Sequence, residues 1–277
     1  MRQSEPHIVA FAVHDAYAGP AAVAATSIMA NSPAHFNFFI LDLGLTDQSK
    51  YQIEKAAGKS RVTFASLPGE MSLDGLALSD LDHAKRLGRE MYAKFYLPEL
   101  LLRHCDRFVY LDSDTLTVGD LSPLFSLQLH PFAVGGVPCF CQPRVDSAEG
   151  VPDFRELGLA PATPCLDTGV LIIDTVAFTE RAIGRRALEY GRSRSRLPLG
   201  DLTAMCAVLR GEWQPLGFEW NFQVYEQLRK SYEGPIPVIY HFSGRHKPFL
   251  LGSRFPDAQI MYDEYRRQCI AAGGPPF

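Results

Sequence analysis

Short apolar runs alternate with helix-forming segments at the start of the chain, and this alternation limits the fold more than any other feature. The runs that we expect to form strands are residues 7–13, 36–41 and 61–65. Helices are predicted between them, from Gly19-Pro20 to residue 30 and from a cap at Thr46 to residue 57. The order strand, helix, strand, helix, strand predicts a parallel sheet with helices on its faces.

The rest of the chain continues this α/β pattern. Further strands are predicted at residues 107–111, 132–137, 170–173 and 236–240. Helices are predicted at 91–102, where Pro98 bends or divides the helix, and at 179–190, 201–209 and 257–270. No internal repeat and no linker divides the sequence, so we expect residues 1–277 to form one domain.

The composition argues against several classes of protein. A net charge of −4 and a pI near 6.1 disfavour a broad nucleic-acid-binding surface, which needs an excess of basic residues. No apolar stretch approaches the roughly 20 residues of a membrane span. The six cysteines form neither a disulfide framework nor a zinc-finger order, so a reducing cytoplasm is the expected location. Cys139 and Cys141 are interpreted as small apolar residues near a strand end rather than as metal ligands.

The motif Asp112-Ser113-Asp114 follows the predicted strand at 107–111 and carries the clearest chemical signal in the sequence. Ligands of open α/β sheets gather beyond the carboxyl ends of the strands. Two carboxylates at such a position can hold Mg²⁺ or Mn²⁺, with substrate phosphates completing the coordination shell. A cation held in this way neutralises the charge that develops on a departing diphosphate.

Two other interpretations of this motif stay open at this point. An Asp-x-Asp after a strand is also a common solvated turn, because aspartate favours turns. Mg²⁺-dependent phosphatases of the haloacid-dehalogenase type place Asp-x-Asp-x-Thr/Val after an apolar strand. That pattern requires Thr or Val at position 116, where this chain has Leu116, and it usually follows the first strand. Here at least three predicted strands precede the motif.

Five segments, read in order, resemble the family 8 glycosyltransferases, which include glycogenin and bacterial lipopolysaccharide glucosyl- and galactosyltransferases. The resemblance runs from about His7 to Phe249. It is carried by residues 11–18 (FAVHDAYA), 92–98 (YAKFYLP), 110–116 (YLDSDTL), 167–171 (DTGVL) and 241–248 (HFSGRHKP). The resemblance implies a GT-A fold with a Rossmann-like, mostly parallel central sheet flanked by helices. It also implies a UDP-sugar donor, Mn²⁺ or Mg²⁺, and retention of the anomeric configuration.

The resemblance also implies a role for each matched residue. The expected metal ligands are Asp112, Asp114 and His241. Gly244 would let the backbone approach the diphosphate closely, and Lys247 would place a positive charge on the departing phosphate. The other matched residues would surround the donor: Ala12, His14 and Tyr17 at the base and ribose, Ser113 within the metal motif, Lys94 at the diphosphate and sugar, and Asp167, Asp201 and Lys247 at the reacting centre. For Tyr17 and Lys94 the alternatives are a surface aromatic residue and a solvated helix face.

The sequence departs from the family pattern in three places, at four residues. His14 stands where Asp or Asn is common, and Asp167 replaces the usual Asn. Leu199-Gly200 replaces an acid-amide pair before Asp201. One hypothesis is a front-face reaction, in which the leaving diphosphate guides the acceptor hydroxyl and the metal and Lys247 stabilise it. The other is that Asp167 orients the sugar or attacks the anomeric carbon.

The sequence leaves the substrates partly open. The expected activity is transfer of a hexose from a UDP-sugar to an acceptor hydroxyl, and a non-catalytic UDP-sugar-binding protein is the alternative. The acceptor is a glycan, a lipid-linked sugar or a small molecule, and we expect loops at 67–82 and 139–164 to contact it. Nothing in those loops identifies it.

Overall fold

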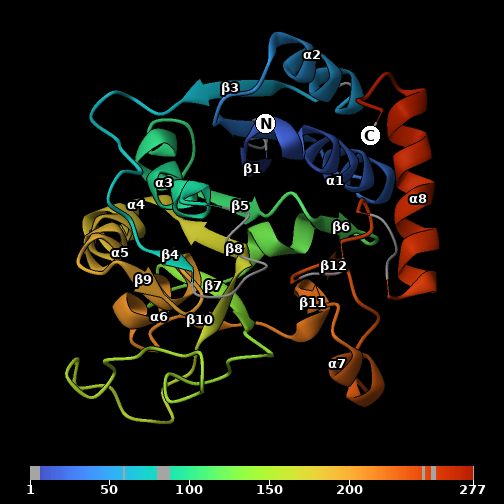
Figure 1. Cartoon of the computed structure of the whole chain (residues 1–277). Helices are drawn as coiled ribbons and strands as arrows, with labels where there is room; N and C mark the ends of the chain where they lie inside the picture. Colours follow the sequence, from blue (N-terminus) through green and yellow to red (C-terminus); the bar gives the residue numbers. More distant parts are fainter. Residues whose placement is uncertain (1–6, 59, 80–87, 245–246, 251–253, 277) are drawn as a thin grey trace.

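A seven-stranded sheet crosses the molecule in the strand order β10-β7-β8-β5-β1-β2-β3 (Figure 1). The computed structural model describes residues 7–58, 60–79, 88–244, 247–250 and 254–276. The strands of this sheet are β1 (His7–Val13), β2 (Phe36–Asp42), β3 (Val62–Ser66), β5 (Arg107–Leu111), β7 (Val134–Pro138), β8 (Leu166–Asp174) and β10 (Gln214–Pro215).

Most neighbours in this sheet are parallel, which confirms the expected mostly parallel arrangement. β1 pairs in parallel with β2 and β5, and β3 continues the parallel set beside β2. β8 is the exception, because it runs antiparallel to both β5 and β7. Residues 166–173 of β8 are all buried, as expected for a strand that is covered on both faces.

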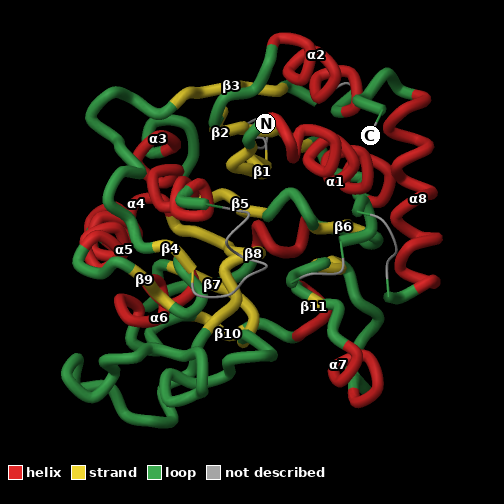
Figure 2. Tube along the Cα trace, viewed as in Figure 1, coloured by secondary structure: helices red, strands yellow, loops and turns green. Residues whose placement is uncertain are grey.

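Helices cover both faces of the sheet (Figure 2). On one face, α1 (Ala18–Asn31) packs with α2 (Asp47–Ala56) and α8 (Pro256–Ala271) over one core cluster that includes Val9 and Phe11. On the other face, Ile8 and Ala10 belong to a second cluster. That cluster involves the 3₁₀ helix Glu90–Tyr96, α3 (Leu97–Leu101), α4 (Thr175–Glu180), α5 (Ile183–Arg192) and α6 (Asp201–Leu209).

Two smaller sheets lie beside the main one. β6 (Thr115–Thr117) pairs antiparallel with β12 (Ile239–His241), which pairs in parallel with β11 (Phe222–Gln223). β4 (Leu78–Ser79) pairs with β9 (Arg196–Leu197). The remaining helices are α7 (Glu226–Ser231) and the 3₁₀ turns Asp15–Tyr17, Ser122–Ser126 and Phe218–Trp220. Within the described residues, no helix combines the length and apolar character that crossing a membrane requires.

The main differences between the predicted elements and the structure are four. The strand predicted at 170–173 is longer, since β8 spans Leu166–Asp174. The predicted helix at 91–102 is a 3₁₀ helix followed by α3, and Pro98 lies in the first turn of α3, where its missing N–H costs nothing. The single helix predicted at 179–190 is wrong: α4 and α5 are separated at Ala182, which has a φ of +53°. The predicted strand at 236–240 is shorter, since Ile236 is exposed and β12 begins at Ile239.

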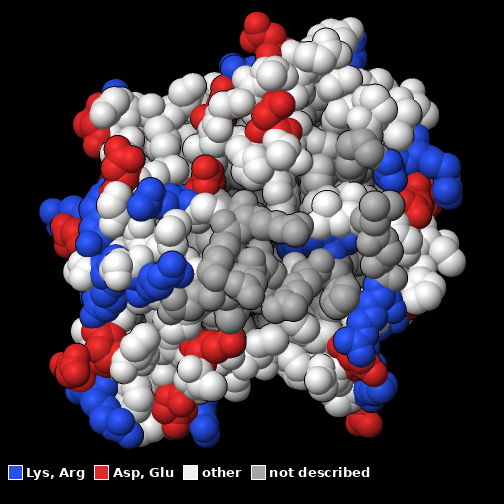
Figure 3. All heavy atoms as spheres, viewed as in Figure 1, with Lys and Arg blue, Asp and Glu red and all other residues white. Residues whose placement is uncertain are grey.

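The charged surface is mixed in sign. Figure 3 shows basic and acidic side chains interspersed on the drawn face, with a basic group at its left. The segment from the end of α5 through β9 supplies Arg192, Arg194 and Arg196. Arg194 forms an ion pair with Asp153, and Arg192 donates to the carbonyl of Ser72. These two arginines therefore tie loops to α5.

Candidate functional site

Two distant parts of the chain bring Asp112, Asp114 and His241 together. The aspartates lie between β5 and β6, and His241 ends β12. The antiparallel pairing of β12 with β6 sets His241 opposite Thr115, next to the motif. One ligand atom from each of the three residues lies within 4.8 Å of the others. His241 Nε2 is 3.4 Å from Asp114 Oδ1 and 3.9 Å from Asp112 Oδ2.

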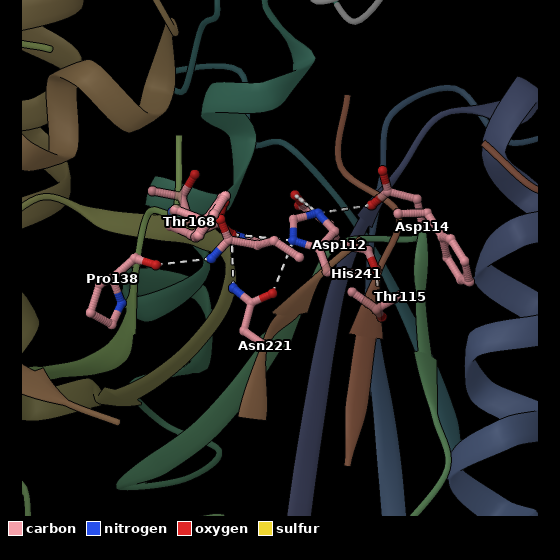
Figure 4. Close-up of polar contacts among 12 residues, drawn as sticks. Asp112, Asp114, Thr115, Pro138, Thr168, Asn221 and His241 are labelled. Carbon is pink, nitrogen blue, oxygen red and sulfur yellow. Dashed lines mark hydrogen bonds and ion pairs between the residues drawn. The ribbon is translucent and has the colours of Figure 1, made fainter. Parts of the chain in front are cut away.

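The other ring nitrogen of His241 faces two acceptors. Nδ1 is 3.0 Å from Asn221 Oδ1 and 3.2 Å from Asp167 Oδ1, so the ring lies between Asn221 and Asp114 (Figure 4). Because a carboxylate only accepts, Nδ1 carries a hydrogen and Nε2 is directed at the motif. Burial lowers the pKa of His241, but the carboxylates of Asp167 and Asp114 outweigh it and raise that pKa to about 10. The carboxylates around His241 therefore favour a positive charge next to its ring.

This donor set fits a divalent cation. Two carboxylates and an imidazole nitrogen are ligands that Mn²⁺ accepts, and the carboxylates also suit Mg²⁺. The second ring nitrogen already has its hydrogen-bond partners, as in most metal-ligating histidines. Among the described residues, these three form the one group of acidic, histidine or cysteine side chains with this convergence. All six cysteines are free thiols.

Two buried lysines flank the motif, one on each aspartate. Lys94 Nζ lies 3.1 Å from Asp112 Oδ1 and 2.9 Å from Asp201 Oδ2. Lys247 Nζ forms an ion pair with Asp114 and donates to the carbonyl of Phe242 at 2.7 Å. Burial lowers the pKa of Lys94, but Asp112 and Asp201 hold it well above its ordinary value. The solvated helix face considered for Lys94 is wrong, because the side chain is only 5% exposed.

A pocket that is open to solvent is lined by both aspartates of the motif. Predicted site residues that line it are Ala12, His14, Tyr17, Lys94, Asp112, Ser113, Asp114 and Asp201. Four further lining residues were not predicted from the sequence: Glu90, Met91, Tyr110 and Thr168. Each lies in or beside a segment that carries the resemblance, but its own residue type gives no signal.

The remaining predicted residues lie around the metal ligands. His241, Lys247 and Asp167 are buried. Gly244 has a φ of +81°, which a glycine adopts without strain, and the Tyr225 ring lies 3.8 Å from the position of a Cβ there. Arg245 and His246, inside the segment 241–248, lie outside the described residues, as do residues 80–82 of the expected acceptor loop.

The structure explains the missing acid-amide pair locally. Gly200 precedes α6 with φ +58° and ψ −115°, a conformation that other residues rarely adopt. A Cβ at Gly200 would lie 2.4 Å from Met91 Sδ. Asp201 directly follows, and its carboxylate accepts from Thr168 Oγ1 at 2.9 Å as well as from Lys94. The backbone here is thus arranged for a glycine, and Asp201 is the carboxylate that faces the pocket.

Comparison with known proteins gives a consistent result. The sequence model described as "Glycosyl transferase family 8" matches residues 8–250. General stress protein A of Bacillus subtilis (strain 168) is 24% identical over 96% of this chain and 96% of its own length. The probable galacturonosyltransferase-like 3 of Arabidopsis thaliana is 30% identical over 60% of this chain, and the match spans about half of that protein (52%).

Solved structures share the fold at low sequence identity. The galactosyltransferase LgtC in complex with donor and acceptor sugar analogs superposes with a TM-score of 0.77 at 20% identity, covering 94% of this chain and 95% of LgtC. The glycosyltransferase GlyE of Streptococcus pneumoniae TIGR4 superposes with a TM-score of 0.67 at 17% identity, covering 98% of this chain and 66% of GlyE. These similarities show the GT-A fold.

Proposed function

This chain belongs to glycosyl transferase family 8, and from that premise we propose that it transfers a hexose from a UDP-sugar to an acceptor hydroxyl, with retention of configuration. The observation that supports this most is the convergence of Asp112, Asp114 and His241 at the edge of a pocket. The phosphatase interpretation is set aside, because the family model covers residues 8–250 and includes the motif.

We assign Asp112, Asp114 and His241 to holding Mn²⁺ or Mg²⁺. When bound, the cation supplies Lewis-acid stabilisation of the departing diphosphate. Lys247 contacts Asp114 and Lys94 contacts Asp112, so both ammonium groups lie next to the place where that negative charge would develop. In this proposal Lys247 stabilises the leaving group directly. Lys94 offsets the negative charge of Asp112 and Asp201 and orients Asp201.

The part of the pocket lined by His14 and Tyr17 suits the nucleotide. The His14 and Tyr17 rings lie edge to face with centroids 4.9 Å apart, and the Tyr17 ring also meets Phe249. This arrangement offers a rigid aromatic edge to a uracil base. In this proposal Ala12, near the end of β1, also borders the base and ribose, and the backbone at Gly244 approaches the diphosphate.

A donor assay tests this proposal. Release of UDP would be measured with Mn²⁺ and a panel of donors that includes UDP-glucose, UDP-galactose and UDP-galacturonate. The last two are suggested by the names of LgtC and of the Arabidopsis relatives. We expect one donor to be hydrolysed or transferred, and Asp112→Ala and Asp114→Asn to reduce the rate at least about 100-fold.

Glu54→Gln serves as the control, because Glu54 is an exposed carboxylate on α2 that does not line the pocket and lies outside both expected acceptor loops. Its rate should equal that of the wild-type protein. Binding of a UDP-sugar without hydrolysis or transfer to any acceptor would instead identify a non-catalytic binding protein. The acceptor panel should contain glycans, lipid-linked sugars and small molecules.

We also propose that the protein acts in the cytoplasm.

A further inference from the structure

Asp167 is the departure from the family pattern whose surroundings are most informative. It lies in β8, is 7% exposed, and does not belong to the described residues that line the pocket. Its Oδ1 accepts a hydrogen bond from the Gly169 amide at 2.9 Å and from Asn221 Nδ2 at 2.8 Å. The same oxygen is 3.2 Å from His241 Nδ1.

These contacts make a closed set of three side chains. Asn221 donates to Asp167 through Nδ2, and this orients its Oδ1 toward His241 Nδ1, 3.0 Å away. The imidazole hydrogen on Nδ1 is therefore shared between two acceptors. Rotation of the ring would break both contacts, so the set keeps a hydrogen on Nδ1 and fixes the direction of Nε2.

A carboxylate behind a metal-ligating histidine has a known physical effect. It raises the basicity of the imidazole and holds the ring in the orientation that the metal requires, and its loss typically weakens metal binding 10- to 100-fold. An asparagine at position 167 would supply an acceptor without the negative charge. The donors all point at Oδ1, so the amide oxygen would take that place and the change removes the charge while keeping the acceptor.

We propose that Asp167, together with Asn221, is a positioning residue that acts through His241 to strengthen cation binding, and is not the nucleophile. The inference rests on the proposed function, because it takes the cation to be bound by His241. It also predicts that this chain holds its cation more tightly than it would with the usual asparagine.

Binding of Mn²⁺ tests the proposal without any donor or acceptor. Electron paramagnetic resonance of free Mn²⁺ would give the dissociation constant for the wild-type protein, Asp167→Asn, Asp167→Ala and Asn221→Ala. We expect affinity to fall about tenfold in Asp167→Asn and Asn221→Ala, and up to about 100-fold in Asp167→Ala. Asp42→Asn is the matched control: it removes another buried, ion-paired carboxylate and should leave Mn²⁺ affinity unchanged.

The rate of transfer as a function of Mn²⁺ concentration separates positioning from nucleophilic attack. We expect kcat of Asp167→Asn at saturating Mn²⁺ to recover to within a few-fold of the wild-type value. A rate that stays lower by about 1000-fold at saturating Mn²⁺ would identify Asp167 as a group that reacts with the donor. Unchanged Mn²⁺ affinity in Asp167→Asn and Asp167→Ala would also overturn the inference. Failure of the wild-type protein to bind Mn²⁺ would contradict the proposed function itself.

Discussion

A glycine gives the His241 imidazole its space. Gly169 lies in β8, and a Cβ built there would stand 2.2 Å from His241 Cε1 and 2.8 Å from both ring nitrogens. No rotation about the Cα–Cβ bond changes the position of a Cβ, so any other residue at 169 displaces the ring. The glycine in the segment DTGVL is thus required by close packing, since its φ is not in the left-handed region.

The variant Gly169→Ala should bind the cation more weakly and should also be less stable. We expect Mn²⁺ affinity to fall more than about tenfold, because the imidazole moves from its partners. Overpacking should lower the free energy of unfolding by about 1–3 kcal/mol. Gly69→Ala is the control, since nothing lies within 4 Å of a Cβ there. Wild-type Mn²⁺ affinity in Gly169→Ala, measured by calorimetric titration, would contradict this account.

The start of α6 depends on the backbone of Gly200. With φ +58° and ψ −115°, this residue directs Asp201 toward Lys94 while Met91 fills the space beside it. A helix normally begins after Ser, Thr, Asp or Asn, and here the conformation replaces the side-chain cap. The helix α6 begins at Asp201 because glycine readily adopts the backbone conformation that precedes it.

A side chain at position 200 should therefore destabilise the fold. We expect Gly200→Ala to lower the free energy of unfolding by about 1–3 kcal/mol, measured by urea denaturation. Gly58→Ala also places alanine at a positive φ but in open space, so its loss should be smaller. A loss in Gly200→Ala no larger than that in Gly58→Ala would contradict this account.

The turn between β2 and α2 depends on one buried carboxylate. Asp42 Oδ1 accepts from the amides of Gly44 at 2.9 Å and Leu45 at 2.6 Å, and Oδ2 pairs with Lys50 at 2.7 Å. Burial raises the pKa of Asp42, but the hydrogen bonds from Lys50 and the two amides outweigh it and lower that pKa. A lowered folded-state pKa contributes stability above the unfolded value, near 3.9, and the contribution is lost as pH falls through the folded value.

We expect Asp42→Asn to reduce the free energy of unfolding at pH 7 by about 1–2 kcal/mol. The gap between variant and wild type should persist down to about pH 4 and close below it, because the wild-type carboxyl is then protonated too. Thermal unfolding between pH 7 and pH 3 measures this gap. A gap that stays constant over that range would mean that the charge of Asp42 has no part in stability.

At the scale of the whole molecule, the site joins segments from nearly the full length of the chain. Residues from β1, the 3₁₀ helix Glu90–Tyr96, the β5–β6 turn, β8 and α6 line the pocket, and β12 brings the histidine. A ligand bound there contacts several elements that separate on unfolding. Its binding free energy therefore adds directly to the stability of the fold.

Mn²⁺ and UDP together should stabilise the protein as a unit. At about 100 times the dissociation constant, a ligand adds about 2.7 kcal/mol, which corresponds to a rise in Tm of about 5 °C for a chain of this size. Differential scanning fluorimetry would show this rise for the wild-type protein and little or none for Asp114→Asn. A rise of equal size in Asp114→Asn would show that the cation is held elsewhere.

The sequence alone determined those features that depend on neighbours along the chain. Apolar runs predict β1, β2 and β5 because burial on both faces of a sheet requires continuous hydrophobic residues. The motif at Asp112 was identifiable because a strand end followed by two carboxylates is visible in a single segment. Thr46 caps α2 as predicted, through the Ser49 amide, since that contact spans only three residues.

The tertiary structure alone decided what depends on pairing between distant segments. The antiparallel direction of β8, the contact of Asn221 with His241 and the filling of space at Gly200 by Met91 join residues far apart in sequence. Hydrophobic periodicity describes whether a residue is buried, but strand register and side-chain contacts arise from packing of the complete chain. For that reason the position of Asp112 and Asp114 at a strand end was predictable, whereas the contacts of Asp167 with Asn221 and His241 required the folded structure.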